Sequence, residues 1–439
     1  MGQLKPVVLL VNPPIYDFSA YDFWLKPYGL LRAAGRLRGS CELMLYDYLD
    51  RWCPDMGGDP AVKFDRWGRG PYPKERCKKP AVYGGIWRYY WRHGRARADF
   101  QRYLAGLKGI SAVLIQTVMT YWYLGVREVI EDVRRYCPGA KIVLGGFYAT
   151  CCAGHARGLG ADVVVEGGRL GPVYELLGIE ASEGYCPPAW ELYPVLKTAV
   201  MTLTEGCPFR CSYCYVPQSG VAFSARPTAD CVADLEHALR LGAENVAFYD
   251  DALLFRPEGG LYPFLEAVLS KGLRVNFHTP NAMHARFMTA EAAQLMVKGG
   301  FKTFYLGFES RSEAFCKQTG AKVEADDLAA AVEHLRRAGA DMNEVTAYEI
   351  LGHPKFEAQQ LEGSMRFASG LGLRVMLSDF SPIPGTPDGE LCRDLVDLNE
   401  PLLHNKTVFP IVLLGDEKVN YYKGLCRSLN SKNKIIAKK

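Results

Sequence analysis

The hydrophobic residues of the first 180 positions fall in short apolar runs that alternate with amphipathic stretches. Strands that are apolar throughout and separated by helices are typical of a parallel sheet with helices on both faces. The pattern therefore predicts an α/β, doubly wound (Rossmann-like) domain over residues 1–180. Its strands are expected at Val7–Asn12, Cys41–Tyr46, Ala112–Gln116, Lys141–Leu144 and Asp162–Val165, and its helices at Tyr28–Leu37 and Gly125–Tyr136.

The carboxyl ends of these strands form the edge at which such a sheet binds ligands. No G-x-G-x-x-G follows the first strand, which disfavours a dinucleotide site. Any ligand of this domain is therefore expected to bind at the carboxyl ends of the strands without a G-x-G-x-x-G motif. The residues placed there are Asn12, Asp47, Thr117, Gly145, Gly146 and Gly167.

Residues 51–108 interrupt the strand and helix pattern with an insertion dense in Trp, Tyr, Arg, Lys and Gly. Its aromatic content argues against disorder, and an internal loop this long is commonly functional. Arginines interleaved with aromatic rings could stack on nucleic-acid bases and contact phosphates. They could equally cover a cofactor or pack two domains together, and we favour these last two roles.

A second alternating series follows a linker at 181–196. Six strand–helix repeats predict a partial (β/α)6 TIM-like barrel over 197–388, with chemistry at the carboxyl ends of its strands. Residues 389–439 are expected to be a less regular C-terminal extension with a frayed basic end. The strands are expected at Ala199–Leu203, Val246–Tyr249, Val275–His278, Thr303–Leu306, Val345–Ile350 and Val375–Leu377, and helices at Ala229–Leu241, Tyr262–Lys271, Ala290–Lys298 and Asp327–Ala338.

Composition narrows the function classes. The net charge of +4 on 439 residues implies no overall affinity for nucleic acid or membrane. No apolar run approaches the roughly 18 residues of a spanning helix, and the N-terminus passes straight into the first strand without room for a signal peptide. We therefore expect a cytoplasmic protein with no membrane partner. Most of the 14 cysteines stand alone and are expected to be small buried residues.

Three cysteines form the exception, because Cys207, Cys211 and Cys214 lie within eight residues directly after the first strand of the second domain. Three thiolates cannot close a tetrahedral zinc site without a fourth ligand from elsewhere. They can ligate three irons of a cubane cluster and leave the fourth iron open. Clusters that only carry electrons use four cysteines, so this spacing indicates a reactive iron–sulfur centre.

The motif C-x-x-x-C-x-x-C, with an aromatic residue before its last cysteine and a six-repeat barrel around it, resembles the radical S-adenosylmethionine (SAM) superfamily. The resemblance implies a [4Fe–4S] cluster whose open iron chelates SAM. It also implies reductive cleavage of SAM to methionine and a 5′-deoxyadenosyl radical that abstracts a hydrogen atom. A reductant such as flavodoxin or ferredoxin would then be a partner.

Other positions of that family are carried over from their motifs. Tyr213 occupies the aromatic position near the adenine. Most members place a Gly-Gly-Glu-type segment after the second strand; here Asp250 or Asp251 stands where a carboxylate would meet the SAM ammonium group. The fourth strand ends in Gly-Phe-Glu-Ser, so Glu309 and Ser310 match residues that contact SAM in related members.

Two further segments, Leu351–Pro354 and Ser381–Pro387, resemble family members with an N-terminal cobalamin-binding-type domain. Members that ligate cobalt through histidine carry Asp-x-His-x-x-Gly, whereas this chain has Leu49 at the histidine position. The resemblance therefore implies cobalamin held at the strand edge of the first domain without a histidine ligand. An empty relic of such a domain is the alternative.

The barrel histidines are either acid–base groups facing the cavity or hydrogen-bonded loop residues. They are His278, His284 and His353, which follow the third and fifth barrel strands.

Three functions follow from these features. The first is methylation of an unactivated carbon or phosphorus centre in a small molecule or peptide, with methylcobalamin as the methyl carrier. The second is a cobalamin-independent radical rearrangement, cyclisation or bond cleavage. The third is modification or binding of RNA through the basic aromatic insertion; nucleic acid is therefore a possible partner, although not the favoured one.

Overall fold

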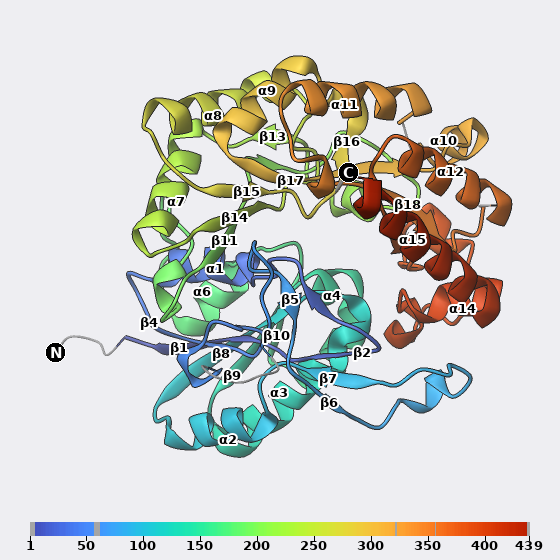
Figure 1. Cartoon of the computed structure of the whole chain (residues 1–439). Helices are drawn as coiled ribbons and strands as arrows, with labels where there is room; N and C mark the ends of the chain where they lie inside the picture. Colours follow the sequence, from blue (N-terminus) through green and yellow to red (C-terminus); the bar gives the residue numbers. More distant parts are fainter. Residues whose placement is uncertain (1–4, 57–61, 321–322, 356, 437–439) are drawn as a thin grey trace. The chain divides into compact units, whose positions relative to one another are not determined.

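The computed structural model describes residues 5–56, 62–320, 323–355 and 357–436 (Figure 1). Contacts within the chain divide it into two units. Unit 1 comprises Met1–Ala199, Glu236–Ala243 and Asn399–Leu402. Unit 2 comprises the remaining segments, Val200–Leu235, Glu244–Leu398 and Leu403–Lys439.

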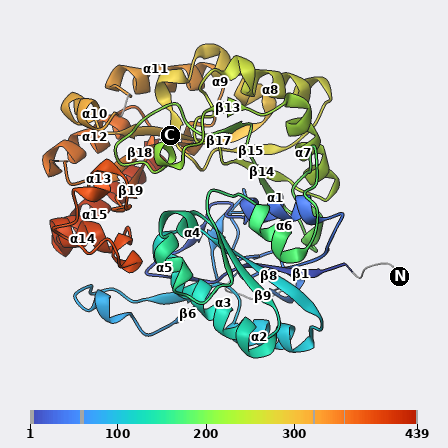
Figure 2. The same cartoon turned by 180° about the vertical axis from the view of Figure 1, so that it is seen from behind.

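Unit 1 is built on a five-stranded parallel sheet of order β10-β9-β8-β1-β4. Helices α1 and α6 lie over one face of this sheet and α2 and α3 over the other (Figures 1 and 2). The predicted doubly wound domain is confirmed. The elements are β1 (Val7–Asn12), β4 (Glu42–Asp47), β8 (Ile110–Thr117), β9 (Lys141–Gly146), β10 (Val163–Val165), α1 (Tyr28–Leu37), α2 (Arg97–Gly106), α3 (Tyr123–Tyr136), α4 (Phe147–Cys151), α5 (Ala153–Arg157) and α6 (Gly171–Leu177).

The insertion is folded onto unit 1. Its strands β6 (Lys74–Arg76) and β7 (Trp91–His93) join β2 (Ile15–Asp17) in an antiparallel sheet of order β2-β7-β6. Two shorter strands, β3 (Tyr21–Asp22) and β5 (Gly70–Pro71), also pair antiparallel. Residues 57–61 of the insertion lie outside the described residues.

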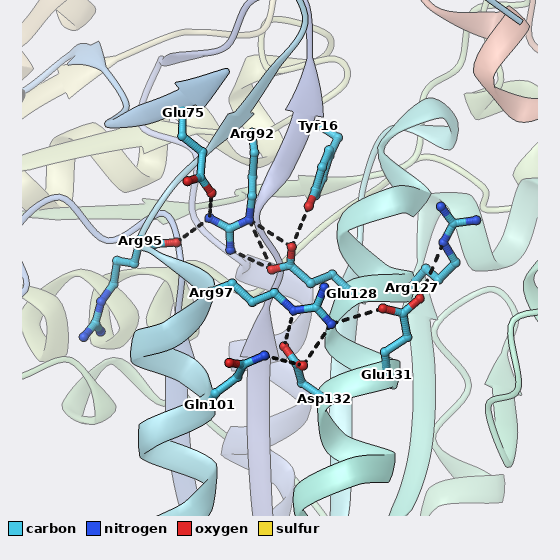
Figure 3. A network of polar contacts seen from close by, with 10 residues as sticks. All are labelled: Tyr16, Glu75, Arg92, Arg95, Arg97, Gln101, Arg127, Glu128, Glu131 and Asp132. Carbon is cyan, nitrogen blue, oxygen red and sulfur yellow. Dashed lines mark hydrogen bonds and ion pairs between the residues drawn. The ribbon is translucent and has the colours of Figure 1, made fainter. Parts of the chain in front are cut away.

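A buried polar network ties the insertion to α3 (Figure 3). The guanidinium of Arg92 donates from Nε to Glu128 Oε2 at 2.9 Å and from Nη2 to Glu128 Oε1 at 2.6 Å. The hydroxyl of Tyr16 donates to the same carboxylate at 2.6 Å. One turn along α3, Asp132 accepts two bonds of 2.9 Å from Arg97 at the start of α2. The insertion therefore belongs to the core of unit 1.

The segment predicted as a linker also packs within unit 1. Trp190 is 1% exposed, and the hydroxyl of Tyr193 donates to Asp47 at 2.6 Å. In sequence, the short helix η4 (Trp190–Leu192) follows β10 and precedes the strands of the second series.

Unit 2 holds a parallel sheet of order β11-β14-β15-β17-β18-β19, in which β16 pairs with β17. Along the chain at least one helix separates each of the successive strands β11, β14, β15, β17, β18 and β19, which confirms the predicted partial TIM-like barrel. The strands are β11 (Thr198–Met201), β14 (Asn245–Phe248), β15 (Asn276–His278), β16 (Met283–His284), β17 (Phe301–Glu309), β18 (Val345–Leu351) and β19 (Arg374–Asp379). The helices are α7 (Thr228–Arg240), α8 (Leu261–Ser270), α9 (Ala290–Gly299), α10 (Glu313–Thr319), α11 (Ala325–Arg337) and α12 (Ala358–Gly370).

The C-terminal extension is regular, and the prediction of a less regular tail is wrong. It forms α13 (Pro387–Glu390), α14 (Val408–Leu414) and the long α15 (Asp416–Ile436). Polar contacts join α15 to the open edge of β19: Asn430 accepts from Val375 N and donates to Val375 O, both at 2.8 Å. Its buried residues Val419, Tyr422 and Leu429 are spaced by three and seven positions and so lie on one face of the helix, a pattern that the sequence expectation did not use. Residues 437–439 lie outside the described residues.

Within the described residues, no helix is both long enough and apolar enough to cross a membrane.

Candidate functional site

The three clustered cysteines lie on the loop that follows β11, and all three are partly buried and free of disulfides. The loop begins with β12 (Thr204–Glu205) and turns at Gly206, whose φ is +68°. A Cβ there would lie 2.6 Å from the carbonyl oxygen of Val221, so only glycine fits. This turn brings the first cysteine to the carboxyl end of the barrel strand.

Asp250 holds the start of the loop. This side chain is 4% exposed and accepts bonds from Leu203 N at 2.9 Å, Thr204 N at 2.6 Å and Thr204 Oγ1 at 2.6 Å. Burial raises the pKa of Asp250 to about 7, although these bonds work against it. The Asp250 carboxylate is already bonded to the start of the cysteine loop. Its neighbour Asp251 is exposed, and of the two aspartates it is therefore better placed to bind a ligand.

The thiols share one electrostatic environment. Burial, followed by the charges of Glu309 and the two other thiols, raises the pKa of Cys211 to about 12. Burial likewise raises the pKa of Cys214 to about 11, with contributions from Asp251 and Cys207. Burial and Asp251 raise the pKa of Cys207 as well. The three sulfurs are therefore close enough to repel one another when ionised.

The donor set fits a cluster better than a single ion. Among the described residues, no three His, Cys, Asp or Glu side chains are grouped tightly enough to hold one metal ion. In a cubane each cysteine binds a different iron, so the ligand sulfurs stand farther apart than around one ion. The backbone N–H groups of Phe209 and Val216 face the sulfurs of Cys207 and Cys214 and favour their thiolate forms.

Glu309 ends β17 in a strained conformation. Its φ of +54° lies in the left-handed region, which is uncommon for a residue with a side chain. Burial raises the pKa of its carboxyl group to about 7, against a hydrogen bond from Tyr213. The Tyr213 hydroxyl also lies within hydrogen-bonding reach of Cys211. The predicted residues Glu309 and Tyr213 thus meet at the cysteine loop.

Ser310 is turned away from this meeting point. It is fully buried, and its hydroxyl accepts a bond from Ser312 N at 3.0 Å at the turn into α10.

The strand edge of unit 1 brings the other predicted residues together. Asn12 donates to Asp47 at 2.7 Å across the β1–β4 pair. Thr117 donates to the carbonyl of Gly145 at 3.0 Å, and Gly146 has a φ of +116°. A Cβ on Gly146 would lie 2.1 Å from the Thr117 carbonyl oxygen, so β8 and β9 can approach only because glycine stands there.

Gly167 follows β10 on the same edge and is exposed, with open space where a Cβ would be apart from one atom of Arg169 at 3.9 Å. The edge at β9 and β10 therefore presents glycine backbone to a ligand.

A pocket of about 310 Å³, counted out to open solvent, lies beside β1 and β8. Leu49 lines it at the position of the absent histidine, and its polar walls are Asn12 and Gln116. No histidine is among its lining residues. The remaining lining residues are Pro13, Pro14, Ile15, Leu25, Val118, Met119, Trp122 and Val126.

The barrel is similar to a known family. The model of the radical SAM superfamily matches residues 201–368, which hold the cysteine loop, Asp250 and Glu309. Over these residues the chain is similar to the radical SAM superfamily. Two curated proteins similar to this chain are tRNA-2-methylthio-N(6)-dimethylallyladenosine synthases, from Novosphingobium aromaticivorans (28% identical over 204 residues) and Cereibacter sphaeroides (26% over 203). The matches cover 43% and 44% of this chain, and the chain spans about 45% of the length of either relative.

Solved structures share the fold over most of the chain. The radical SAM methyltransferase TsrM from Kitasatospora setae, with tryptophan and a SAM analogue bound, has a TM-score of 0.64 at 15% identity, with 89% of this chain and 76% of that chain covered. The cobalamin-dependent SAM radical enzyme OxsB, with aqua-cobalamin and SAM bound, has a TM-score of 0.59 at 12% identity, with 97% and 61% covered. At these identities the likeness establishes the fold alone: a doubly wound domain followed by a partial TIM-like barrel.

Two of the barrel histidines, His278 and His353, are buried and hydrogen-bonded, as the structural alternative to acid–base chemistry requires. His278 is fully buried and bonds Asn245 at 3.1 Å and Thr303 at 3.2 Å. His284 packs against the ring of Phe209 with centroids 4.8 Å apart. His353 is 1% exposed and is hydrogen-bonded, as described below.

Sequence reasoning missed Glu349, which lies in β18 opposite Glu309. It is fully buried, and neither carboxylate oxygen has a hydrogen-bond partner among the described residues. Burial, and the charge of Glu309, hold its pKa well above the usual range. The available signal was a lone glutamate inside the apolar run Val345–Leu351.

Proposed function

We propose that this protein cleaves SAM reductively at a [4Fe–4S] cluster and uses the resulting radical chemistry for cobalamin-dependent methylation of an unactivated centre. The observation that carries the proposal is the loop of Cys207, Cys211 and Cys214 after the first strand of a radical SAM barrel. The cluster supplies the electron that breaks the carbon–sulfur bond of SAM, and cobalamin supplies a methyl carrier.

The residues of the barrel have separate tasks in this proposal. The cysteines bind three irons, and Asp250 fixes the backbone ahead of the first of them. Asp251 and Glu309 offer carboxylates to the ammonium group and the ribose of SAM, because cationic and hydroxyl donors bind carboxylates well. Tyr213 shields Cys211 and Glu309 from water.

Unit 1 would hold cobalamin at the edge formed by Asn12, Thr117, Gly145, Gly146 and Gly167. Glycine backbone at strand ends allows close approach of a large cofactor. The apolar Leu49 would face the corrin where a histidine ligand stands in other members.

The central experiment is anaerobic purification and reconstitution, followed by iron and sulfide analysis and measurement of 5′-deoxyadenosine under reducing conditions. The wild-type protein is expected to bind four irons per chain and to form 5′-deoxyadenosine. Cys211→Ala should abolish this product. Cys137→Ala, which removes a lone thiol of unit 1, is the matched control and should retain it. If Cys211→Ala forms the product at the native rate, the cluster assignment is wrong.

Cobalt analysis separates methylation from its main rival. One cobalt per chain, with the absorption spectrum of cobalamin, would support the methyl carrier. If the protein binds no cobalamin on reconstitution, a cobalamin-independent rearrangement, cyclisation or cleavage becomes the better reading.

RNA modification is a second candidate, since both curated relatives named above act on tRNA by name. The loop between β6 and β7 also exposes Trp87 by 90% and Tyr89 by 61%, beside Arg76, whose guanidinium lies 4.0 Å from the Tyr89 ring centre. Exposed rings next to basic groups suit stacking on single-stranded bases. RNA binding that weakens steeply with salt, and weakens further in Trp87→Ala, would favour this candidate.

A further inference from the structure

Ser212, in the middle of the cysteine loop, is held from outside by two distant segments. Its backbone N–H donates to the carbonyl of Thr319, at the end of α10, at 2.8 Å. Its carbonyl accepts from the backbone N–H of Asp388, in α13, at 3.1 Å. The Ser212 hydroxyl donates to the Asp388 carboxylate. The backbone N–H, the carbonyl and the side chain of Ser212 are thus all engaged between Cys211 and Cys214.

Asp388 is itself fixed on two further sides. Its side chain is fully buried, with His353 Nε2 at 2.9 Å from Oδ2 and Lys355 Nζ at 2.5 Å from Oδ1. His353 Nδ1 accepts a bond from the backbone N–H of Lys355 at 3.1 Å, so its Nε2 carries the hydrogen and donates to Asp388. Asp388 therefore accepts three donors, and Lys355 balances its charge.

These contacts join the cysteine loop to the end of the fifth barrel strand. His353 and Lys355 follow β18 directly, while Asp388 follows β19 along the chain. A buried carboxylate with three donors holds one geometry, because displacing it would leave several polar groups unpaired. Residues behind metal ligands orient those ligands in this way.

We propose that Asp388 is a positioning residue for the cluster, acting through Ser212 to fix the backbone between Cys211 and Cys214. The inference rests on the proposed function, since the cluster is what the loop positions. Asp388 touches neither iron nor substrate. Its effect is to keep the sulfurs of two ligands at a constant separation.

Paired variants of the full chain test this role. Ser212→Ala removes only the hydroxyl of Ser212, and Ser212→Thr keeps a hydroxyl at that position. Asp388→Asn removes the charge of the carboxylate. Asp234→Asn is the matched control, because Asp234 is a buried carboxylate of unit 2 that bonds Arg226 at 2.8 Å. Each protein is reconstituted anaerobically. Iron loss to excess ferrous chelator is then timed, and the EPR spectrum of the reduced cluster is recorded with and without SAM.

Ser212→Ala and Asp388→Asn are each expected to lose iron roughly tenfold faster than wild type, the scale of one hydrogen bond to a charged group. Both should alter the EPR line shape, which a merely structural role would leave unchanged. The double variant should behave as Asp388→Asn alone, because both changes break the same contact. Ser212→Thr and Asp234→Asn should match wild type.

Two outcomes separate the inference from the function beneath it. If wild type carries the cluster while Ser212→Ala and Asp388→Asn keep its iron and its EPR spectrum, the positioning role is wrong and the proposed function stands. If wild type binds no [4Fe–4S] cluster, the proposed function fails and takes the inference with it. Should Asp388→Asn misfold by circular dichroism, Ser212→Ala carries the test alone, since Ser212 is partly exposed.

Discussion

Replacing Arg92 by Met should destabilise unit 1 strongly, because it leaves the buried carboxylate of Glu128 without its cation. The two side chains are 4% and 3% exposed, so solvent does not screen their interaction. Glu128 would keep only the bond from Tyr16, at 2.6 Å. Removing one partner of a buried ion pair costs about 3–5 kcal/mol, and the two-pronged geometry in Figure 3 places this pair at the upper end.

Urea denaturation of the apo-protein, followed by tryptophan fluorescence, measures this effect as a fall in the free energy of unfolding of unit 1. Arg127→Met is the matched control, because Arg127 and Glu131 on the same helix are 4.0 Å apart and half exposed. It should change the free energy of unfolding by less than about 1 kcal/mol. The double variant Arg92→Met, Glu128→Leu should recover much of the loss, since it removes both charges together.

A loss below about 1 kcal/mol in Arg92→Met would refute the reasoning, because the ion pair would then not hold the insertion in place. The expected loss would instead establish that the segment from 74 to 108 is part of the core of unit 1. Only the exposed residues of this segment would then be available to contact nucleic acid.

Three further predictions concern the two cofactor edges. The pKa of about 7 at Asp250, against 3.8 for an exposed aspartate, corresponds to about 4 kcal/mol. As the pH rises from about 4 to above 7, the free energy of unfolding of wild type should therefore fall by that amount relative to that of Asp250→Asn. Urea denaturation that gives the same difference between the two proteins at every pH in this range would contradict the prediction. Gly146→Ala should lower the thermal midpoint by several degrees, because the new Cβ overlaps the Thr117 carbonyl, and an unchanged midpoint would refute the steric argument. Leu49→His should add nitrogen hyperfine splitting to the EPR signal of bound cob(II)alamin, whereas splitting already present in wild type would show that cobalt has a nitrogen ligand from the cofactor's own base or from another residue.

Much of the fold could be predicted because its strands carry their signal locally. Runs such as Val7–Val11 are apolar throughout, since parallel strands are covered on both faces. Their bounds in the structure match the sequence expectation to within a few residues. Helix α15 was missed although Val419, Tyr422 and Leu429 are buried at helical spacing, because these apolar positions are few within a 21-residue helix rich in polar residues.

The site could be predicted only as far as its motifs reach. Cys207, Cys211 and Cys214 are neighbours in sequence, so their association was visible. Asp388 contacts Ser212 across 176 residues, and no local pattern encodes that meeting. Asp250 shows the same limit: its position after β14 was predicted, but its engagement by the backbone of the cysteine loop follows from the pairing of strands.

The acid groups near the cysteine loop give the site a preference for cationic ligands that the cysteine motif alone does not give. Burial raises the pKa of Cys211, Cys214, Glu309 and Glu349, and none of these four has an ion-pair partner among the described residues. A buried group without a counter-charge takes up a proton to avoid the cost of burying its charge. Cys211, Cys214 and Glu349 are therefore favoured in their protonated forms at neutral pH, whereas Glu309, with a pKa of about 7, would be favoured as a carboxylate by a cation bound beside it. SAM carries a sulfonium and an ammonium group, so the preference of these residues for cations and the proposed chemistry of the cysteine loop point to the same ligand.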